Sequence, residues 1–338
     1  MNIPLLLTLV AAIAQAAPPP TPARKAAAAP ANDALQIQVM LDRAGFSPGV
    51  IDGRGGSNTR KALAVYEKNG GKPDAAVAAT TKYTITAEDG AGPFVPVPAD
   101  MTEKSSLPAL GYASLLEMLG ERFHASPALL TKLNLGVTFA ANAEITVPNV
   151  EPMVPPAPQP KEAARPQTAK SDAAAAEAPA AATPSAPAKP TAPAAPPSAA
   201  KGDVVVTVSK SASAATVTDA SGKIILYAPV TTGSQHDPLP IGEWKVNGSQ
   251  FNPTFHYNPD LFWDADEAHA KAKIPAGPNN PVGLVWIDIS KEHYGLHGTP
   301  EPATVGKTES HGCVRLTNWD ALRLAGLVKP GSRVIFKD

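Results

Sequence analysis

Short runs of β-branched and apolar residues, separated by Ser- and Gly-rich turns, dominate the chain from residue 203 onward. Such runs are typical of β-hairpins, and they fill DVVVTVSKSASAATVTDASGKIILYAPVTTG and continue in GEWKVNG and VGLVWIDI. One helix is expected near Asn318 to Leu324, with Thr317 as its N-cap and Asp320 at the capping-box position. A KPG turn leads into a last strand, Arg333 to Phe336. The pattern predicts a mainly β domain over residues 203–337, a sandwich or barrel with one short helix.

The first half of the chain has apolar residues at helical spacing instead. Residues 33–44 predict one helix, and a second is expected from Asn58, after the glycine-rich turn GFSPGVIDG. Together they predict a small α-helical module over residues 32–72. Residues 104–150 predict a second module with helix, turn, helix, loop and strand. Its helix starts are marked by Ser114, with Glu117 three residues on, and by the Ser126-Pro127 pair.

Proline marks the boundaries between these regions. The chain has 38 prolines, well above the usual share of roughly 5%, and they concentrate in residues 18–31 and 151–200. These segments are too poor in large apolar residues to form a core, so we expect 18–31 to be disordered and 151–200 to be an extended linker. The linker predicts two independent halves with few contacts between them, one that holds a large target and one that acts on it.

The N-terminus indicates export. An apolar run from Ile3 to Ile13 is followed by the small-residue site Ala14-Gln15-Ala16, which predicts a cleaved signal peptide over residues 1–17. No basic residue precedes the run, so an uncleaved interfacial anchor is the alternative. We therefore expect an exported protein of the periplasm or cell wall.

Charge and cysteine content narrow the functional classes. With 29 basic and 30 acidic residues, the chain lacks the excess of basic residues that is typical of nucleic-acid-binding proteins. Its single cysteine, Cys313, cannot form an internal disulfide. An unpaired cysteine in an exported chain is either a buried apolar residue or a reactive thiol.

The surroundings of Cys313 favour a reactive thiol. His311 lies two residues before it, and His297 lies 16 residues before it in the motif HGTP. A thiol with an ordinary pKa near 8.5 needs a neighbouring base, and either histidine could accept its proton. We expect the resulting imidazolium to lower the pKa of the thiol. A zinc site built from His293, His297, His311 and Cys313 is the rival interpretation, although the Tyr-Gly pair after His293 breaks any helix there.

The motifs HGTP, SHGCVRL and the following Asp320 resemble the signature of the L,D-transpeptidase catalytic domain, the YkuD family, over residues 203–336. The resemblance implies a β-rich catalytic fold in which Cys313 is the nucleophile and His297 the proton acceptor, without cofactor or metal. It further implies that the Gly298 carbonyl orients His297 and that Ser310 and His311 shape the site. The N–H groups of Gly312 and Cys313 would form the oxyanion hole. Arg315 would either brace the loop through Asp320 or bind a substrate carboxylate.

Residues 45–66 resemble a peptidoglycan-binding domain, and residues 104–150 resemble a LysM module. The first resemblance rests on the motif residues Gly45, Gly49, Asp52, Gly53, Thr59, Ala62, Leu63 and Tyr66. The second rests on Leu115, Leu119, Phe123, Leu129, Leu130, Leu133 and Asn134. The glycines suit turns that need positive φ.

These resemblances imply an enzyme that forms 3→3 cross-links between peptidoglycan stem peptides through a cysteine thioester. The expected partners are stem peptides, glycan and carbapenem-type inhibitors. The same site could instead act as an L,D-carboxypeptidase, exchange D-amino acids or attach an outer-membrane protein through a lysine. A catalytically inactive wall-binding protein is the alternative from a different class.

Overall fold

The computed structural model describes residues 31–74, 76–157, 203–261 and 270–338. The predicted signal peptide and most of the predicted disordered segment and linker lie outside these residues. Among the helices that the structure describes, none is both long and apolar enough to cross a membrane.

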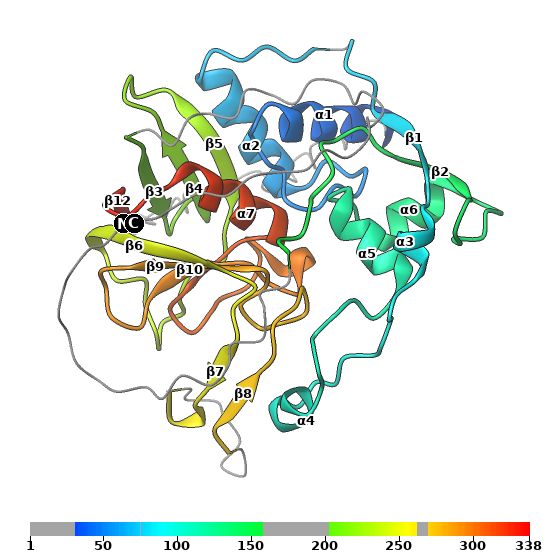
Figure 1. Ribbon diagram of the computed structural model, residues 1–338. Helices are drawn as coiled ribbons and strands as arrows, with labels where there is room; N and C mark the ends of the chain where they lie inside the picture. Colours follow the sequence, from blue (N-terminus) through cyan, green and yellow to red (C-terminus); the bar gives the residue numbers. More distant parts are fainter. Residues whose placement is uncertain (1–30, 75, 158–202, 262–269) are drawn as a thin grey trace, which may run out of the picture.

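The C-terminal domain, residues 203–338, is built on one curled, mixed eight-stranded sheet (Figure 1). The strand order is β11-β10-β9-β6-β12-β3-β4-β5. β12 pairs with β3 and β10 pairs with β11 in parallel, while the other neighbours are antiparallel. The strands are β3 (Val205–Ser209), β4 (Ala214–Thr218), β5 (Ile224–Pro229), β6 (Gly242–Phe251), β9 (Val285–Ile289), β10 (Gly295–His297), β11 (Val314–Arg315) and β12 (Arg333–Lys337). The predicted mainly β fold is confirmed.

Helix α7 (Asn318–Leu327) follows β11 and packs its apolar side on the sheet. Thr317 is its N-cap, because the Thr317 side chain accepts a hydrogen bond from the Asp320 N–H at 3.2 Å. Leu324 and Ala325 are buried in the same cluster as Val206 and Phe336. Two 3₁₀ turns, η1 (Pro259–Leu261) and η2 (Pro302–Thr304), complete the helical content described for this domain.

The N-terminal part, residues 31–157, has one core that joins the two predicted modules. Its elements are α1 (Ala31–Arg43), α2 (Ser57–Lys68), β1 (Thr80–Thr84), α3 (Ala87–Gly90), α4 (Met101–Ser105), α5 (Leu115–Arg122), α6 (Pro127–Leu133) and β2 (Glu144–Pro148). Leu35, Val39 and Ile51 of the first module lie in one buried cluster with Leu119 and Leu130 of the second. β1, which follows the first module, pairs with β2 at the end of the second. The two modules therefore fold as a unit.

The expectation that few contacts would cross between the halves is wrong. Figure 1 shows α2 beside β5, and α5 beside α7. The Gly45–Ser47 turn docks on β5, with hydrogen bonds of 2.8 Å from the Ser47 N–H to the Tyr227 carbonyl and from the Tyr227 N–H to the Gly45 carbonyl. Gly45 has φ +81°, and a Cβ there would lie 2.9 Å from the Ile225 carbonyl oxygen. The predicted positive φ is thus confirmed, and it serves the contact between the halves.

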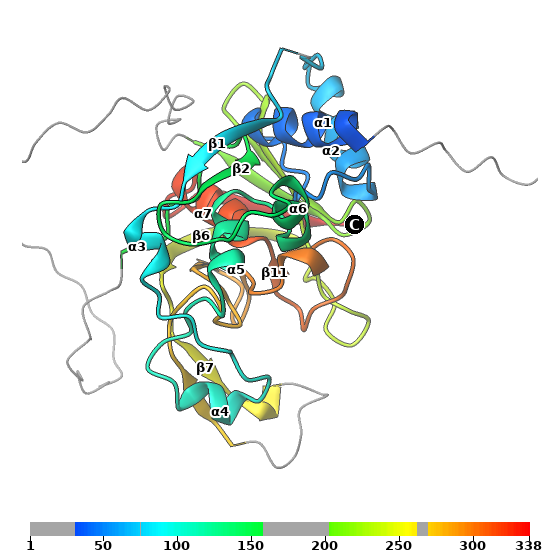
Figure 2. The same ribbon diagram turned by 90° about the vertical axis from the view of Figure 1, so that its right-hand side faces the viewer.

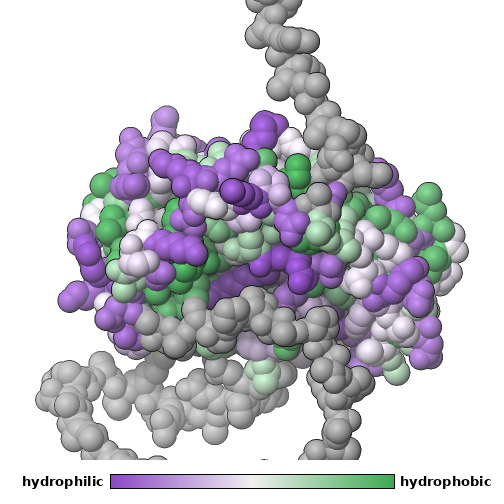
Figure 3. Space-filling model, turned by 90° about the horizontal axis from the view of Figure 1, so that it is seen from above, coloured by the Kyte–Doolittle hydropathy of each residue, from purple (hydrophilic) through white to green (hydrophobic). Residues whose placement is uncertain are grey.

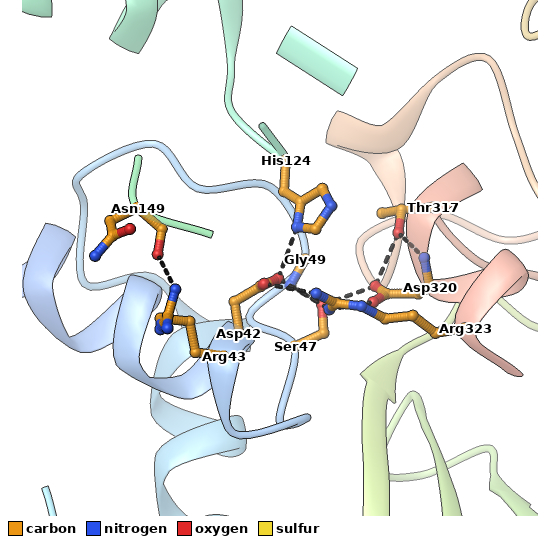
Figure 4. A network of polar contacts seen from close by, with 9 residues as sticks. All are labelled: Asp42, Arg43, Ser47, Gly49, His124, Asn149, Thr317, Asp320 and Arg323. Atoms are coloured by element: carbon orange, nitrogen blue, oxygen red, sulfur yellow. Dashed lines mark hydrogen bonds and ion pairs between the residues drawn. The ribbon is translucent and has the colours of Figure 1, made fainter. Parts of the chain in front are cut away.

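A buried polar network holds α1 to α7 (Figure 4). The Asp42 carboxylate accepts two hydrogen bonds from Arg323, at 2.9 and 3.2 Å, and one from His124 at 3.0 Å. Ser47 donates to the Asp320 carboxylate at 2.7 Å. The His124 ring also stacks on Trp319, with 5.0 Å between ring centroids. The network joins α1, α7 and the segment after α5.

The first residues of the predicted linker are part of the folded molecule. Met153 is buried against Leu284 and Trp319. Asn252 donates to the carbonyl oxygens of Pro156 and Ala157 at 2.9 Å. The boundary predicted at residue 151 is therefore too early.

A two-stranded extension projects from the C-terminal domain (Figure 2). It consists of β7 (Phe255–Tyr257) and β8 (Ala272–Ile274). Its buried residues Tyr257 and Ile274 pack against Leu110, with Met101 of α4 at the edge of the cluster. The N-terminal part thus covers the C-terminal domain at the extension as well as at β5 and α7.

Candidate active site

The pairing of β10 with β11 places Cys313 and His297 on neighbouring segments of the sheet. β10 ends at His297, and Cys313 directly precedes β11. The strands are parallel, with Leu296 opposite Val314 and His297 opposite Arg315. The residues between them leave the sheet through η2 and return, which places Cys313 opposite Gly295 at the start of β10, where the thiol forms a hydrogen bond with the Gly295 backbone. The separation of 16 residues allows this return, as the sequence predicted.

His297 is held in one tautomer. Its Nδ1 lies 2.6 Å from the Gly298 carbonyl oxygen, and because a carbonyl can only accept, Nδ1 carries the hydrogen. The ring is buried and stacks on Trp286, with 5.4 Å between centroids. Burial, with the charge of Arg315, lowers the pKa of His297 to about 3. The imidazole is therefore neutral at neutral pH, with Nε2 free to accept a proton.

The thiol of Cys313 has a raised pKa, so the predicted lowering is wrong. Burial raises the pKa, and a backbone hydrogen bond with Gly295 and the charge of Arg315 offset this only in part. The sulfur lies 3.8 Å from the His293 carbonyl oxygen. Since the imidazole is neutral, no imidazolium stabilises the thiolate at rest. The pair is a neutral thiol beside a neutral base, and the proton would have to move as the sulfur attacks.

Ser310 and Gly312 shape the turn that carries Cys313. The Ser310 hydroxyl donates to the Cys313 carbonyl at 2.6 Å, and the Ser310 backbone pairs with Thr232 and Ser234. Gly312 has φ +103°, and a Cβ there would lie 2.9 Å from the Tyr294 ring. Only glycine fits this position without strain. His311, which is half-buried, lies in the same turn, and its predicted role stays a prediction.

The environment of Arg315 bears on its two predicted roles. Asp320, the predicted bracing partner, accepts from Ser47 and from Thr317 at 2.8 Å and faces Arg323 at 3.8 Å. The charge of Arg315 acts on His297 and Cys313. Both predicted roles of Arg315, bracing through Asp320 and binding a substrate carboxylate, stay predictions.

Sequence reasoning missed two residues of the site, Tyr294 and Asp237. Burial raises the pKa of Tyr294, and the charges of Cys313 and Asp237 add to this effect. Asp237 has a buried carboxylate oxygen, Oδ2, without a hydrogen-bond partner in the described part of the chain. Tyr294 lies three residues before His297, and this closeness in the sequence could have identified it as a site residue. The sequence did not indicate Asp237, because its position near Tyr294 depends on how the loop of residues 233–239 folds.

The rival zinc site draws on residues within the described ranges, 31–74, 76–157, 203–261 and 270–338. They contain no group of three or more His, Cys, Asp or Glu side chains arranged to hold a metal ion. His293, one of the four ligands considered from the sequence, is exposed and faces Glu292 at 3.5 Å.

A cleft of about 500 Å³ lies where the two halves meet. One wall comes from the predicted peptidoglycan-binding motif and the start of α2, and another comes from α6. The third wall is Pro302–Lys307 of the loop between His297 and Cys313. The Asn58 side chain donates to the Val305 carbonyl at 3.1 Å and ties the first wall to the third. The polar residues that line the cleft include Gln38, Asp52, Arg54, Asn58, Lys132 and Lys307.

Comparison with known proteins identifies the family. The family model of the L,D-transpeptidase catalytic domain, YkuD, matches residues 203–336. The chain is 49% identical over 57 residues to the protein named L,D-transpeptidase YkuD of Bacillus subtilis (strain 168), covering 17% of this chain and 35% of that relative. It is 31% identical over 143 residues to the protein named L,D-transpeptidase YqjB of the same organism, covering 40% of this chain and 73% of that relative.

Solved structures include L,D-transpeptidase 3 from Mycobacterium tuberculosis in complex with a faropenem-derived adduct. It is 19% identical, with 40% of this chain and 60% of that chain covered and a TM-score of 0.34. The family model and the YqjB match show that this chain belongs to the YkuD L,D-transpeptidase family. The chain spans about a third of the length of the first curated relative. The resemblance drawn from HGTP and SHGCVRL is thereby confirmed, while those of residues 45–66 and 104–150 stay predictions.

Proposed function

We propose that this protein is a peptidoglycan L,D-transpeptidase that works through a thioester on Cys313. The observation that carries the proposal is the hydrogen bond from His297 Nδ1 to the Gly298 carbonyl, in a strand next to Cys313. It leaves Nε2 as the unprotonated ring nitrogen, which could accept the thiol proton of Cys313.

In the proposed reaction the substrate is a tetrapeptide stem. Cys313 attacks the carbonyl of its third residue, at an L-configured centre, while His297 Nε2 takes the thiol proton. The backbone N–H groups of Gly312 and Cys313 bind the developing oxyanion. The C–N bond breaks, His297 gives its proton to the departing D-Ala amine, and a thioester remains.

An acceptor amine then attacks the thioester, and its proton returns to the thiolate by way of His297. The product is a 3→3 cross-link and the enzyme is restored without a cofactor. Arg315 is proposed to bind a substrate carboxylate, and Ser310 and His311 to keep the turn in place. Water, a free D-amino acid or a protein lysine could take the place of the acceptor amine, which gives the carboxypeptidase, exchange and attachment alternatives.

The N-terminal part is proposed to bind peptidoglycan, and the chain to act after export to the periplasm or cell wall. The cleft between the halves supports this role, because the exposed cations Arg54, Lys132 and Lys307 line it. Stem peptides are rich in carboxylates and would complement these charges. Figure 3 shows hydrophilic and hydrophobic side chains interspersed over the face seen from above, with no single large apolar patch there.

The test of the chemistry is acylation by a carbapenem. Intact-mass spectrometry of the full chain after incubation with imipenem should show one adduct per molecule, which is absent from Cys313→Ala. Tetrapeptide muropeptides should then give cross-linked dimers with the wild type only. A wild-type protein that stays unmodified would favour the inactive wall-binding alternative.

The test of the cleft is sedimentation with isolated sacculi. The double variant Arg54→Glu, Lys132→Glu should bind less protein than the wild type, while Lys72→Glu, an exposed lysine outside the cleft, should bind normally. Equal binding by all three proteins would show that the cleft does not hold peptidoglycan.

A further inference from the structure

One side chain, Asn318, packs against Gly298, the residue whose carbonyl orients His297. Asn318 is the first residue of α7 and is fully buried. A Cβ on Gly298 would lie 2.1 Å from Asn318 Oδ1, so the amide rests against the Gly298 backbone. A Cβ on Gly283 would lie 2.7 Å from the Gly298 carbonyl carbon and 2.1 Å from the same Asn318 Oδ1, so these three residues pack tightly together. The close packing of Gly283 and Asn318 against Gly298 limits how far the Gly298 carbonyl can turn away from His297 Nδ1.

The orientation of the Asn318 amide is fixed by three hydrogen bonds. Its Oδ1 accepts from the Leu284 N–H at 3.1 Å, and its Nδ2 donates to the Pro278 carbonyl at 3.2 Å. The second hydrogen of Nδ2 goes to Glu121 Oε1 at 2.8 Å. A flipped amide would face acceptors with its oxygen and a donor with its nitrogen, so it is excluded.

Glu121 belongs to the N-terminal part. It lies in α5 and is 6% exposed, and its Oε2 accepts from the Tyr112 hydroxyl at 3.0 Å. Arg122, the next residue, binds Asp89 and Tyr83 and does not neutralise it. The Glu121 carboxyl group therefore reaches across the boundary between the N-terminal part and the C-terminal domain. Buried polar groups are normally hydrogen-bonded, and the partner of Glu121 here is Asn318, which packs against Gly298 in the active site.

We propose that Glu121 is a positioning residue for the reaction, which holds Asn318 so that the Gly298 carbonyl keeps His297 in its active tautomer. The N-terminal part thereby completes the active site as well as holding a target. The proposal rests on the function proposed above for Cys313 and His297.

The protonation of Glu121 fits this arrangement. Burial raises its pKa to about 8, and the hydrogen bonds from Asn318 and Tyr112 offset the rise only in part. The charge of Glu117, on the same helix, raises the pKa of Glu121 further. A neutral acid still accepts from Asn318 through its carbonyl oxygen, so the contact does not require a buried charge.

The experiment compares Glu121→Leu, Glu121→Asp and Glu121→Gln in the full chain. Glu121→Leu removes the acceptor, and Glu121→Asp withdraws it by one methylene. Both should slow acylation by imipenem at pH 7 by about 10- to 100-fold, the range caused by misplacing a catalytic group by about an ångström. Glu121→Gln keeps an oxygen that can accept from Asn318 and should react at the wild-type rate. Asp89→Asn, which breaks the buried pair with Arg122 away from Asn318, is the control for lost stability and should also react normally.

The readout that separates positioning from packing is the tautomer of His297 by ¹⁵N NMR. The wild type, Glu121→Gln and Asp89→Asn should show Nδ1 protonated, and Glu121→Leu and Glu121→Asp a mixture. Folded Glu121→Leu and Glu121→Asp proteins that react at the wild-type rate and keep one tautomer would overturn the proposal. If Glu121→Leu does not fold, Glu121→Asp decides alone. A wild type that is not acylated would refute the proposed function, and the tautomer comparison would still test the positioning of His297.

Discussion

Removing the charge of Asp42 should destabilise both halves together. Asp42 is fully buried, and burial alone would raise its pKa, but Arg323 and His124 reverse this and hold the pKa well below its usual range. His124 is buried and its pKa is lowered by burial, so Arg323 supplies the permanent positive charge. Breaking a buried ion pair by removing one partner costs about 3–5 kcal/mol. In Asp42→Asn, Arg323 still has the Asp320 carboxylate 3.8 Å away as a partner, so we expect the free energy of unfolding to fall by ~3 kcal/mol, near the lower limit.

The measurement is urea unfolding at pH 7, followed by tryptophan fluorescence and by circular dichroism. Trp319 stacks on His124 and reports on the network itself. Asp42→Asn should shift both signals equally and lower the melting temperature by roughly 6–12 °C. Arg323→Met should cost more, ~5 kcal/mol, because it leaves a fully buried carboxylate without its guanidinium. Lys82→Met is the control, since the Lys82–Glu144 pair is exposed and such pairs contribute about 0–1 kcal/mol.

The dependence on pH gives a second check of the same reasoning. The pKa of Asp42 is lower in the folded than in the unfolded protein, so its stabilisation is present above the unfolded pKa, about 3.9, and is lost as the pH falls below it. The difference between the wild type and Asp42→Asn should therefore shrink in acid. A loss below about 1 kcal/mol at pH 7, or two transitions that respond separately to the substitution, would refute the view that the halves form one cooperative unit.

Three further predictions concern other parts of the molecule. Because burial raises the pKa of Cys313, the rate of alkylation by iodoacetamide should still be rising above pH 8.5, and a plateau below that pH would contradict the neutral thiol. Gly283→Ala should destabilise the protein by about 3 kcal/mol or more, because Gly283 has φ +63° and the new Cβ would meet Asn318 Oδ1 at 2.1 Å. Gly326→Ala is the control in the same melting assay: Gly326 lies in α7 with open space around it, so alanine there should stabilise the protein by about 0.5–1 kcal/mol. Met153→Ala should cost about 2–5 kcal/mol in urea unfolding, whereas no loss would mean that residues 151–157 belong to the linker after all.

Local signals in the sequence predicted the local structure well. Thr317, Ser114 and Ser126 are N-caps whose side chains accept the expected hydrogen bonds, because capping depends on residues within one turn. The alternating runs from residue 203 became strands for a similar reason. The structure has His297 at the end of β10 and Cys313 directly before the neighbouring β11, and the spacing of 16 residues in the sequence leaves room for the loop between them.

What the sequence could not predict depends on packing between distant segments. The raised pKa of Cys313 follows from burial, which no neighbouring residue reveals. Glu121 looks like an ordinary helix residue until α5 meets α7 and the carboxyl group reaches Asn318. The linker suggested separate halves because a long proline-rich segment permits separation without requiring it.

The docking of the Gly45–Ser47 turn on β5 limits how this protein can be recombined. A chimera that joins its C-terminal domain to a foreign wall-binding module would leave Tyr227, Trp319 and Arg323 facing a partner that does not match them. The unit that can be exchanged intact is therefore residues 31–338 together. Engineering that changes the target of this enzyme would have to alter side chains in the cleft and leave the surface between α1, α5 and α7 as it is.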